Sequence, residues 1–161
     1  MADREAILGG HPVAGFDVEI NFEGLGLAEG VIRRIRERAL DLSVPLRAGG
    51  VHMMGSIRRN FKVGGRPKKW TPLKPATLKA KAPKTKILID SARLMGSITF
   101  KVGRDRLDVG TNLIYARIHQ RGGQAGRGLA TTIPARPYSI FQESDVRVIG
   151  RFIGEHLAGV S

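Results

Sequence analysis

The chain carries a tyrosine and a histidine at helical spacing, Tyr115 and His119, within the segment 115–123. Four-residue spacing places both side chains on one face of a helical turn, and a histidine beside a phenol suggests acid–base chemistry. The segment holds no serine, cysteine or carboxylate that would serve as a nucleophile or second acid. We therefore interpret His119 as a histidine whose ring hydrogen-bonds a backbone carbonyl or a neighbour.

The other groups that take part in acid–base or metal chemistry are scattered. The four histidines show neither a His-x-x-x-His spacing nor a carboxylate at ligand spacing: His11, His52, His119 and His156. Asp105 and Asp108 bracket Arg106, and Asp90 is the only acid at the edge of a long basic block. These carboxylates are too few for a two-metal nuclease, so we predict no catalytic residue, no metal and no cofactor. A nuclease would instead show metal-dependent cutting that Asp90→Ala or Asp108→Ala abolishes.

Glycines and prolines frame the motif and the extended segment that follows it. Gly122 and Gly123 are predicted to end the helical turn, because glycine adopts the backbone angles found at helix ends. In segment 133–138, Pro134 and Pro137 fix their own φ and favour extended residues before them. Rigid framing of this kind suits a surface that presents a shape to a partner.

Hydrophobic periodicity predicts the elements around this frame. The predicted helices cover 28–42, a stretch from Pro45 to Phe61 with a bend at Gly49-Gly50, one or two turns at 75–82, and 143–157. The predicted strands cover 16–22 and 87–89, with 98–102 and 106–110 forming a hairpin. Asp90 or Ser91 is expected to cap a turn over 92–97. The glycine-rich stretch 122–128 lacks a phosphate-loop ending and is predicted to be a mobile loop, with ordering at a subunit contact as the alternative.

We therefore predict an α+β fold. An antiparallel sheet of about four strands would pack against a bent N-terminal helix and a C-terminal helix. The length of 161 residues predicts a single domain over 1–161, in which 62–86 is a basic loop rich in proline and glycine. We expect no membrane span, because no apolar run is long enough, and no disulfide, because cysteine is absent.

The charge of the chain is concentrated in its middle third. Residues 42–89 hold 12 lysines and arginines and no acid, whereas the net charge of the whole chain is +13. Such a block either keeps the protein solvated or attracts a polyanion or an acidic partner. The predicted contacts with nucleic acid or an acidic partner are Arg58, Arg59, Lys62, Arg66, Lys68, Lys69, Lys74, Lys79, Lys81, Lys84 and Lys86. Trp70, the only tryptophan, is either a packing anchor or an interface residue.

Several short segments, in order, resemble the virion-morphogenesis (tail-completion) family of Mu-like phages over about residues 65 to 140. The segments are Trp70-Thr-Pro-Leu73, Ala76-Thr-Leu-Lys79, Ile87-Leu-Ile-Asp90, Leu94-Met-Gly-Ser97, Val109-Gly-Thr-Asn112, Tyr115-Ala116, Ile118-His-Gln120, Gly122-Gly123 and Ile133-Pro-Ala-Arg-Pro137. The chain departs from the family pattern at Ser91-Ala92, where Thr-Gly is usual, and at Arg121, where an apolar or aromatic residue is usual.

The resemblance implies a structural, non-enzymatic protein of the phage neck that completes the tail and joins it to the head connector. Copies would form a homo-oligomeric ring beside a portal adaptor and a tail-terminator or tail-tube protein, in the virion after assembly in the host cytoplasm. The residues expected at the subunit interface are Tyr115, His119, Gln120, Arg136, Tyr138 and Trp70. The alternative is a non-specific DNA-binding protein that uses segment 42–89, and genomic DNA in the ring's channel would make the two compatible.

Overall fold

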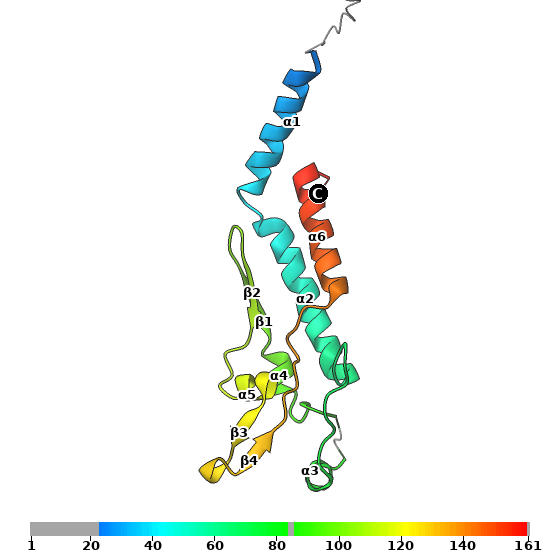
Figure 1. Cartoon of the computed structure of the whole chain (residues 1–161), viewed down its shortest axis with the longest axis vertical. Helices are drawn as coiled ribbons and strands as arrows, with labels where there is room; N and C mark the ends of the chain where they lie inside the picture. Colours follow the sequence, from blue (N-terminus) through cyan, green and yellow to red (C-terminus); the bar gives the residue numbers. More distant parts are fainter. Residues whose placement is uncertain (1–22, 84–85, 161) are drawn as a thin grey trace, which may run out of the picture.

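Two long helices placed end to end, α1 (Glu23–Ala39) and α2 (Ser43–Val63), give the molecule its elongated shape (Figure 1). The computed structural model describes residues 23–83 and 86–160. The helix predicted over 28–42 is confirmed as α1, which begins earlier and ends at Ala39. The strand predicted over 16–22 lies outside the described residues.

The bend predicted at Gly49-Gly50 is wrong, because α2 runs through both glycines without interruption. Both are buried, and each allows a close approach. A Cβ on Gly50 would lie 2.4 Å from the ring of Phe100, and one on Gly49 would lie 3.3 Å from Ile149. The glycines therefore bring α2 close to a strand and a helix, which outweighs their low helix propensity.

The C-terminal helix, α6 (Glu143–Ala158), packs along α2 and confirms the helix predicted at 143–157 (Figure 1). The hydrophobic core continues from α2 toward the other end of the molecule and includes Met53, Ile57 and Phe61. Burying side chains of this size contributes roughly 1.5–3 kcal/mol each. The core thus fixes α2 as the element on which the rest of the chain is assembled.

The single four-stranded sheet predicted from the sequence is wrong, although the α+β class holds. The structure contains two separate two-stranded antiparallel sheets within its described part. The first is the predicted hairpin, β1 (Thr99–Val102) and β2 (Leu107–Gly110), which packs on α2. The second joins β3 (Gly123–Ala125) to β4 (Thr131–Ile133) at the far end of the molecule (Figure 1).

Two local predictions fail around residue 90. The segment 87–89 is a turn rather than a strand, since Leu88 has a φ of 58° that a strand does not allow. The short helix α4 (Arg93–Gly96) occupies the predicted turn, but neither Asp90 nor Ser91 caps it. Its cap position is Ala92, with a φ of 59° and no side-chain hydrogen bond.

The long basic segment contains the predicted helical turns as α3 (Pro75–Lys81). The glycine-rich stretch predicted to be a mobile loop is instead the β3–β4 hairpin, whose tip is the 3-10 helix η1 (Arg127–Leu129). Among the described residues, no helix combines the length and apolar character needed to cross a membrane.

Candidate interface groove

A groove of about 470 Å³ opens between α3 and the β3–β4 hairpin. α4 and the helix that carries the tyrosine–histidine motif, α5 (Ala116–Arg121), supply further parts of its lining. Three of the predicted interface residues, Tyr115, His119 and Arg136, line this groove together. Sequence reasoning therefore identified residues that the fold brings to one place, although it did not predict the groove.

The helical turn places Tyr115 and His119 as predicted. Their rings meet edge to face, with centroids 5.9 Å apart. The turn ends at Gly122, whose φ of 74° favours glycine. A Cβ at this position would also lie 2.8 Å from the backbone nitrogen of Ala135. Glycine thus lets the helix end touch the extended segment that follows β4.

Gln120 joins the two motifs by hydrogen bonds. Its side-chain amide donates to the carbonyl of Ser139 at 3.0 Å, and its carbonyl oxygen accepts from the N–H groups of Tyr138 and Ser139 at 3.0 and 3.1 Å. The N–H of Arg136 also donates to the carbonyl of His119 at 2.8 Å. These bonds make the turn and the proline-framed segment one rigid unit, in which Gln120 is a structural link.

Arg136 forms part of the floor of the groove. Its guanidinium is buried and donates through Nε and an Nη to the carbonyl of Thr71, both at 3.2 Å. Burial lowers the pKa of Arg136 below its ordinary value. Arginine titrates so far above neutral pH that the side chain still carries its proton. The charge therefore stays, and its hydrogen bonds tie the extended segment to the start of the basic segment.

His119 has a ring nitrogen that is buried without a hydrogen bond in the described part of the chain. Its Nδ1 is buried without a hydrogen-bond partner among the described residues, so the predicted ring hydrogen bond is wrong for that atom. Burial, and then the positive charge of Arg136, lowers the pKa of His119, which keeps the ring neutral at neutral pH. A buried nitrogen without a hydrogen bond is destabilising.

The other two predicted interface residues are buried in the protomer. Trp70 donates from its indole N–H to the carbonyl of Pro137 at 3.0 Å and packs edge-on against Phe61, with centroids 5.8 Å apart. Tyr138 contacts the same phenylalanine, with centroids 5.2 Å apart, and burial raises its pKa. Trp70 is therefore a packing anchor, as one of the two interpretations held, and both aromatic residues support the groove from behind.

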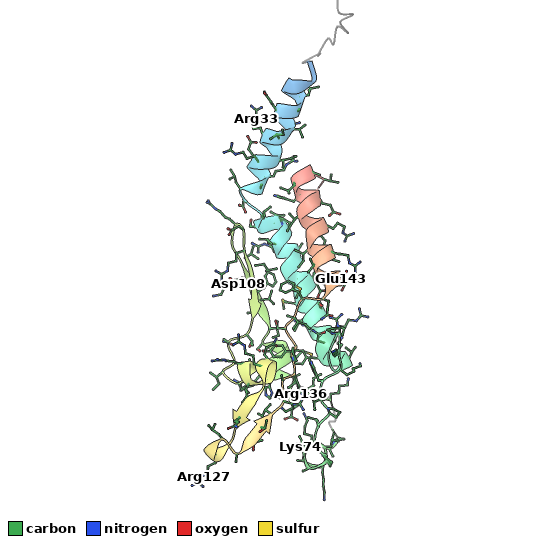
Figure 2. All side chains as sticks on the ribbon, in the orientation of Figure 1. Arg33, Lys74, Asp108, Arg127, Arg136 and Glu143 are labelled. Atoms are coloured by element: carbon green, nitrogen blue, oxygen red, sulfur yellow. The ribbon has the colours of Figure 1, made fainter. Side chains whose placement is uncertain are left out.

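The basic residues predicted to contact nucleic acid or an acidic partner differ in where they lie: some line the groove and most are exposed. Lys74 and Lys81 line the groove. Lys74 lies, with Arg127 of the β3–β4 hairpin, at the end of the molecule away from Arg33 of α1 (Figure 2). Lys84 lies outside the described residues. The exposed members are Arg58, Arg59, Lys62, Lys68, Lys69, Lys74, Lys79 and Lys86. Sequence reasoning missed Arg93, which adds a further cation to the groove lining.

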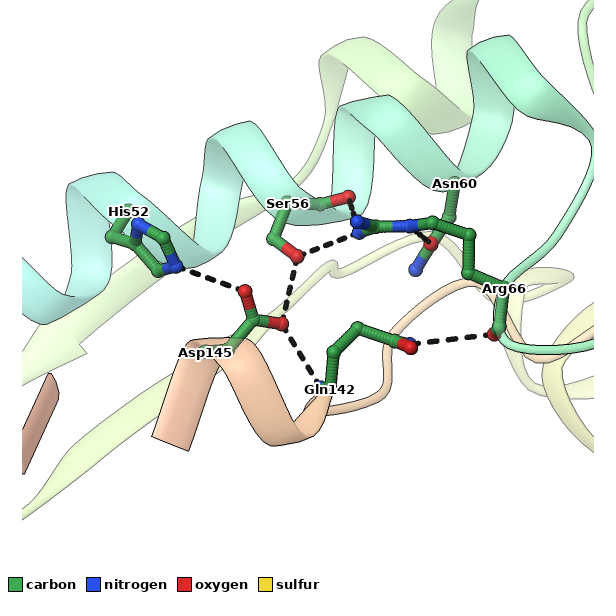
Figure 3. A network of polar contacts seen from close by, with 6 residues as sticks. All are labelled: His52, Ser56, Asn60, Arg66, Gln142 and Asp145. Carbon is green, nitrogen blue, oxygen red and sulfur yellow. Dashed lines mark hydrogen bonds and ion pairs between the residues drawn. The ribbon is translucent and has the colours of Figure 1, made fainter. Parts of the chain in front are cut away.

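Arg66 is engaged in a polar network instead (Figure 3). Its guanidinium donates to the side-chain carbonyl of Asn60 at 2.7 Å and to the hydroxyl of Ser56 at 2.8 Å. Ser56 in turn donates to Asp145 at 2.7 Å, at the start of α6. The arginine thus links the basic segment to α2 directly and to α6 through Ser56, and it serves the fold.

The same network contains a serine, a histidine and an aspartate without forming a catalytic triad. In a triad the histidine lies between the other two and takes the serine proton. Here Asp145 lies in the middle, with His52 at 2.9 Å from one carboxylate oxygen and Ser56 bonded to the other (Figure 3). Ser56 is also buried. The arrangement therefore joins α2 to α6 and does not activate a nucleophile.

Asp145 also caps its own helix. Its carboxylate accepts from the N–H of Gln142 at 2.9 Å, in a reciprocal capping box. Burial raises the pKa of Asp145, but hydrogen bonds from Gln142, Ser56 and His52 outweigh it, so the pKa lies below its ordinary value. Its two α2 partners, Ser56 and His52, are 89 and 93 residues away in the sequence.

The remaining chemistry-bearing residues stay apart. His156 approaches the carbonyls of Arg38 and Asp41 at 3.3 and 3.1 Å, and Asp108 pairs with Arg106 on the surface at 2.8 Å. Across residues 23–83 and 86–160, no three histidines or carboxylates gather as a metal site would require. The groove is therefore the feature that best fits a function.

Comparison with known proteins gives two matches to the sequence. Residues 27–158 match the phage virion morphogenesis family. The "Mu-like prophage FluMu G protein 2" of Haemophilus influenzae is 35% identical over 128 residues, which covers 80% of this chain and 87% of that protein. No solved structure matches the chain.

Proposed function

The chain belongs to the phage virion morphogenesis family, and we propose that it is a structural, non-enzymatic protein of the neck or tail-completion region. In this proposal its copies form a ring that joins the tail to the head connector. The observation that carries the proposal is the groove, because residues from several segments of the family resemblance line it. The elements that supply this lining lie at one end of an elongated molecule (Figure 1).

A second surface complements the groove. α1 packs only its last part on α6, through Arg38, and leaves an apolar stripe exposed. Leu27, Val31 and Ile35 follow helical spacing on this stripe, with 76%, 45% and 40% of their surfaces exposed. An exposed apolar face of this kind marks a contact with another protein.

The stripe and the groove lie on different parts of one molecule, which favours a ring over a two-fold dimer. When two different surfaces of identical subunits meet, the contact is head-to-tail and repeats around an axis. A rotation that closes gives a ring, and a ring is the geometry that a tail and a head connector share. The expected neighbours are a portal adaptor on one side and a tail-terminator or tail-tube protein on the other.

Mass measurement of the purified protein, alone and with its neck partners, tests the proposal. We expect a closed oligomer in at least one of the two samples, and strictly monomeric protein in both would contradict it. The double variant Val31→Gln/Ile35→Gln should weaken the oligomer, because it removes apolar surface from the stripe. The matched control is Arg33→Gln/Glu37→Gln on the opposite side of α1, which should assemble normally.

DNA binding is the second candidate function, favoured by the nine exposed cations among the described residues of segment 42–89. Binding to random duplex DNA would fall steeply with salt, with a slope of about −0.9 per phosphate neutralised on a log–log plot. Neutralising Lys68 and Lys69 should reduce that slope by about two. Absence of binding at low salt would contradict the DNA-binding alternative. We would then expect these lysines to contact an acidic surface of a partner protein.

A further inference from the structure

We propose that the groove binds residues 16–22 of a second copy as an added β-strand beside β4. This inference rests on the proposed assembly of identical subunits and names the segment that links them. It is carried by the free edge of a sheet, the charge around the groove, the sequence of segment 16–22, and the position of α1 in the molecule.

The groove offers a strand edge next to an apolar cleft. β4 pairs with β3 on one side only, in a sheet of two strands, and Thr131, Thr132 and Ile133 of β4 line the groove. A strand with one unpaired edge presents N–H and C=O groups that an extended peptide can pair with. Added strands bind through these main-chain bonds, and pockets for alternate side chains give them specificity.

Segment 16–22 has the sequence that such a site requires. It reads Phe-Asp-Val-Glu-Ile-Asn-Phe, so its apolar residues alternate with Asp17, Glu19 and Asn21. Side chains alternate between the two faces of a strand. One face would therefore place four apolar side chains in the cleft, while the other would carry two carboxylates toward its surroundings.

The charges of the two partners are opposite. The groove lining contains four cations and one acid: Lys74, Lys81, Arg93, Arg136 and Asp90. Residues 1–22 contain four acids and one arginine. Charge complementarity of this kind directs the approach of a partner and disfavours wrong ones.

The occupant must come from another copy because of where α1 begins. Segment 16–22 directly precedes α1 in the sequence, and α1 and α2 follow one another along the molecule (Figure 1). The elements α3 and β4, whose residues line the groove, lie beyond the far end of α2 (Figure 1). Together the two helices span about 55 Å at 1.5 Å per residue. Seven extended residues span at most about 25 Å. The segment is therefore too short to reach the groove of its own chain, whereas in a head-to-tail assembly it meets the groove of a neighbour.

Directed disulfide formation tests this pairing in the full-length chain, which has no cysteine of its own. One protein carries Thr132→Cys on β4. A second protein carries one cysteine in the segment, at each of Asp17, Val18, Glu19 and Ile20 in turn. Each pair is mixed, oxidised mildly and separated without reductant. We expect a mixed dimer whose yield alternates from one position to the next, because only every second side chain of a strand faces the same side.

Matched controls separate strand pairing from chance collision. Ala28→Cys on exposed α1 should give no mixed dimer with Thr132→Cys beyond the background of random contact. The double variant Val18→Asp/Ile20→Asp should lose assembly by mass measurement. Asp17→Asn/Glu19→Gln should still assemble and form the link, with a yield that depends less on salt.

The outcomes distinguish failure of this inference from failure of the proposed function. A ring that forms without any cross-link, or with equal cross-links at all four positions, overturns strand pairing and leaves the ring proposal intact. A protein that stays monomeric with and without neck partners contradicts both. Val18→Cys/Thr132→Cys in one chain, oxidised at high dilution, should give no internal link. A monomeric internal link would overturn the assignment to a second copy.

Discussion

Asp145 and His119 are both polar and largely buried, but their surroundings differ completely. Between α2 and α6 the carboxylate of Asp145 receives hydrogen bonds from Gln142, Ser56 and His52, so the network is complete within one protomer (Figure 3). In the groove, Nδ1 of His119 has no partner among the described residues, and the lining is apolar with excess positive charge. The polar groups of the first region are satisfied within the fold, whereas the second region contains a buried nitrogen that is not.

This contrast separates residues that hold the fold from residues for which we propose a role in assembly. A complete polar network stabilises one arrangement of the helices, since each broken bond leaves a buried group unpaired. A buried group that has no partner costs stability. Substitutions in the α2–α6 network should therefore reduce stability, whereas substitutions of exposed groove residues such as Tyr115 should reduce assembly and leave stability nearly unchanged.

The largest effect is expected from Asp145→Ala. The substitution leaves Ser56, His52 and the N–H of Gln142 without their acceptor, so the free energy of unfolding should fall by about 3 kcal/mol. Urea denaturation at neutral pH measures the loss. Asp108→Ala is the control, because water screens its exposed pair with Arg106 and the pair should contribute little to stability. Similar losses in the two variants would remove the distinction between a buried network and a surface pair.

Two glycines of α2 allow a packed position and an open position to be compared within one helix. Gly50→Ala places a methyl group against the Phe100 ring, and overpacking of this kind should cost about 1–3 kcal/mol. Gly55→Ala meets no atom within 4 Å and should gain up to about 1 kcal/mol from helix propensity. Thermal unfolding of both variants measures the difference. A gain in Gly50→Ala would mean that the helix does not depend on this close approach.

A smaller change, a gain in the free energy of unfolding, is expected from a substitution at Ala92. This residue borders the groove and has a φ of 59°. The left-handed conformation is unfavourable for alanine by about 1–2 kcal/mol, and the family usually has glycine here. Ala92→Gly should therefore raise the free energy of unfolding by up to about 1 kcal/mol, after the entropy that glycine loses on folding. The melting temperature should rise by a few degrees. Ala28→Gly on exposed α1 is the control and should lower it.

The elements that sequence reasoning located share a strong period. α1, α6 and the β1–β2 hairpin each combine apolar spacing with a clear boundary, and all three appear where expected. β3 and β4 were missed because each has three residues, and the glycine-rich sequence around them resembles a loop. The segment 87–89 has the composition of a strand, but the backbone at Leu88 turns it.

The candidate site was predicted as a set of residues and not as a shape. The spacing of Tyr115 and His119 defined one face of a turn, and the prolines defined the extended segment beside it. The polar network could not be predicted from the sequence, because its members are far apart along the chain. Asp145 is 89 residues from Ser56 and 93 residues from His52. Only packing of α6 on α2 brings them together, and no local pattern encodes that contact.

The smallest effect expected is a difference in how the two regions respond to acid. For His119 the folded pKa is lowered by burial and by Arg136, so the unfolded chain binds a proton first, near pH 6.5. Its contribution to stability is therefore present above about pH 6.5 and is lost as the pH falls. For Asp145 the folded pKa is also lowered, but its contribution is lost only below about pH 3.8.

Free energies of unfolding at pH 7, 5 and 3 separate these windows when the protein is compared with His119→Gln, which cannot charge. Subtracting the two curves removes the groups that they share. Between pH 7 and 5 the unsubstituted protein should lose more stability than His119→Gln, while the loss below pH 4 should be common to both because Asp145 is unchanged. Parallel curves from pH 7 to 5 would mean that His119 is charged as easily in the fold as in the unfolded chain. The groove would then lack the desolvated nitrogen that sets it apart from the α2–α6 network.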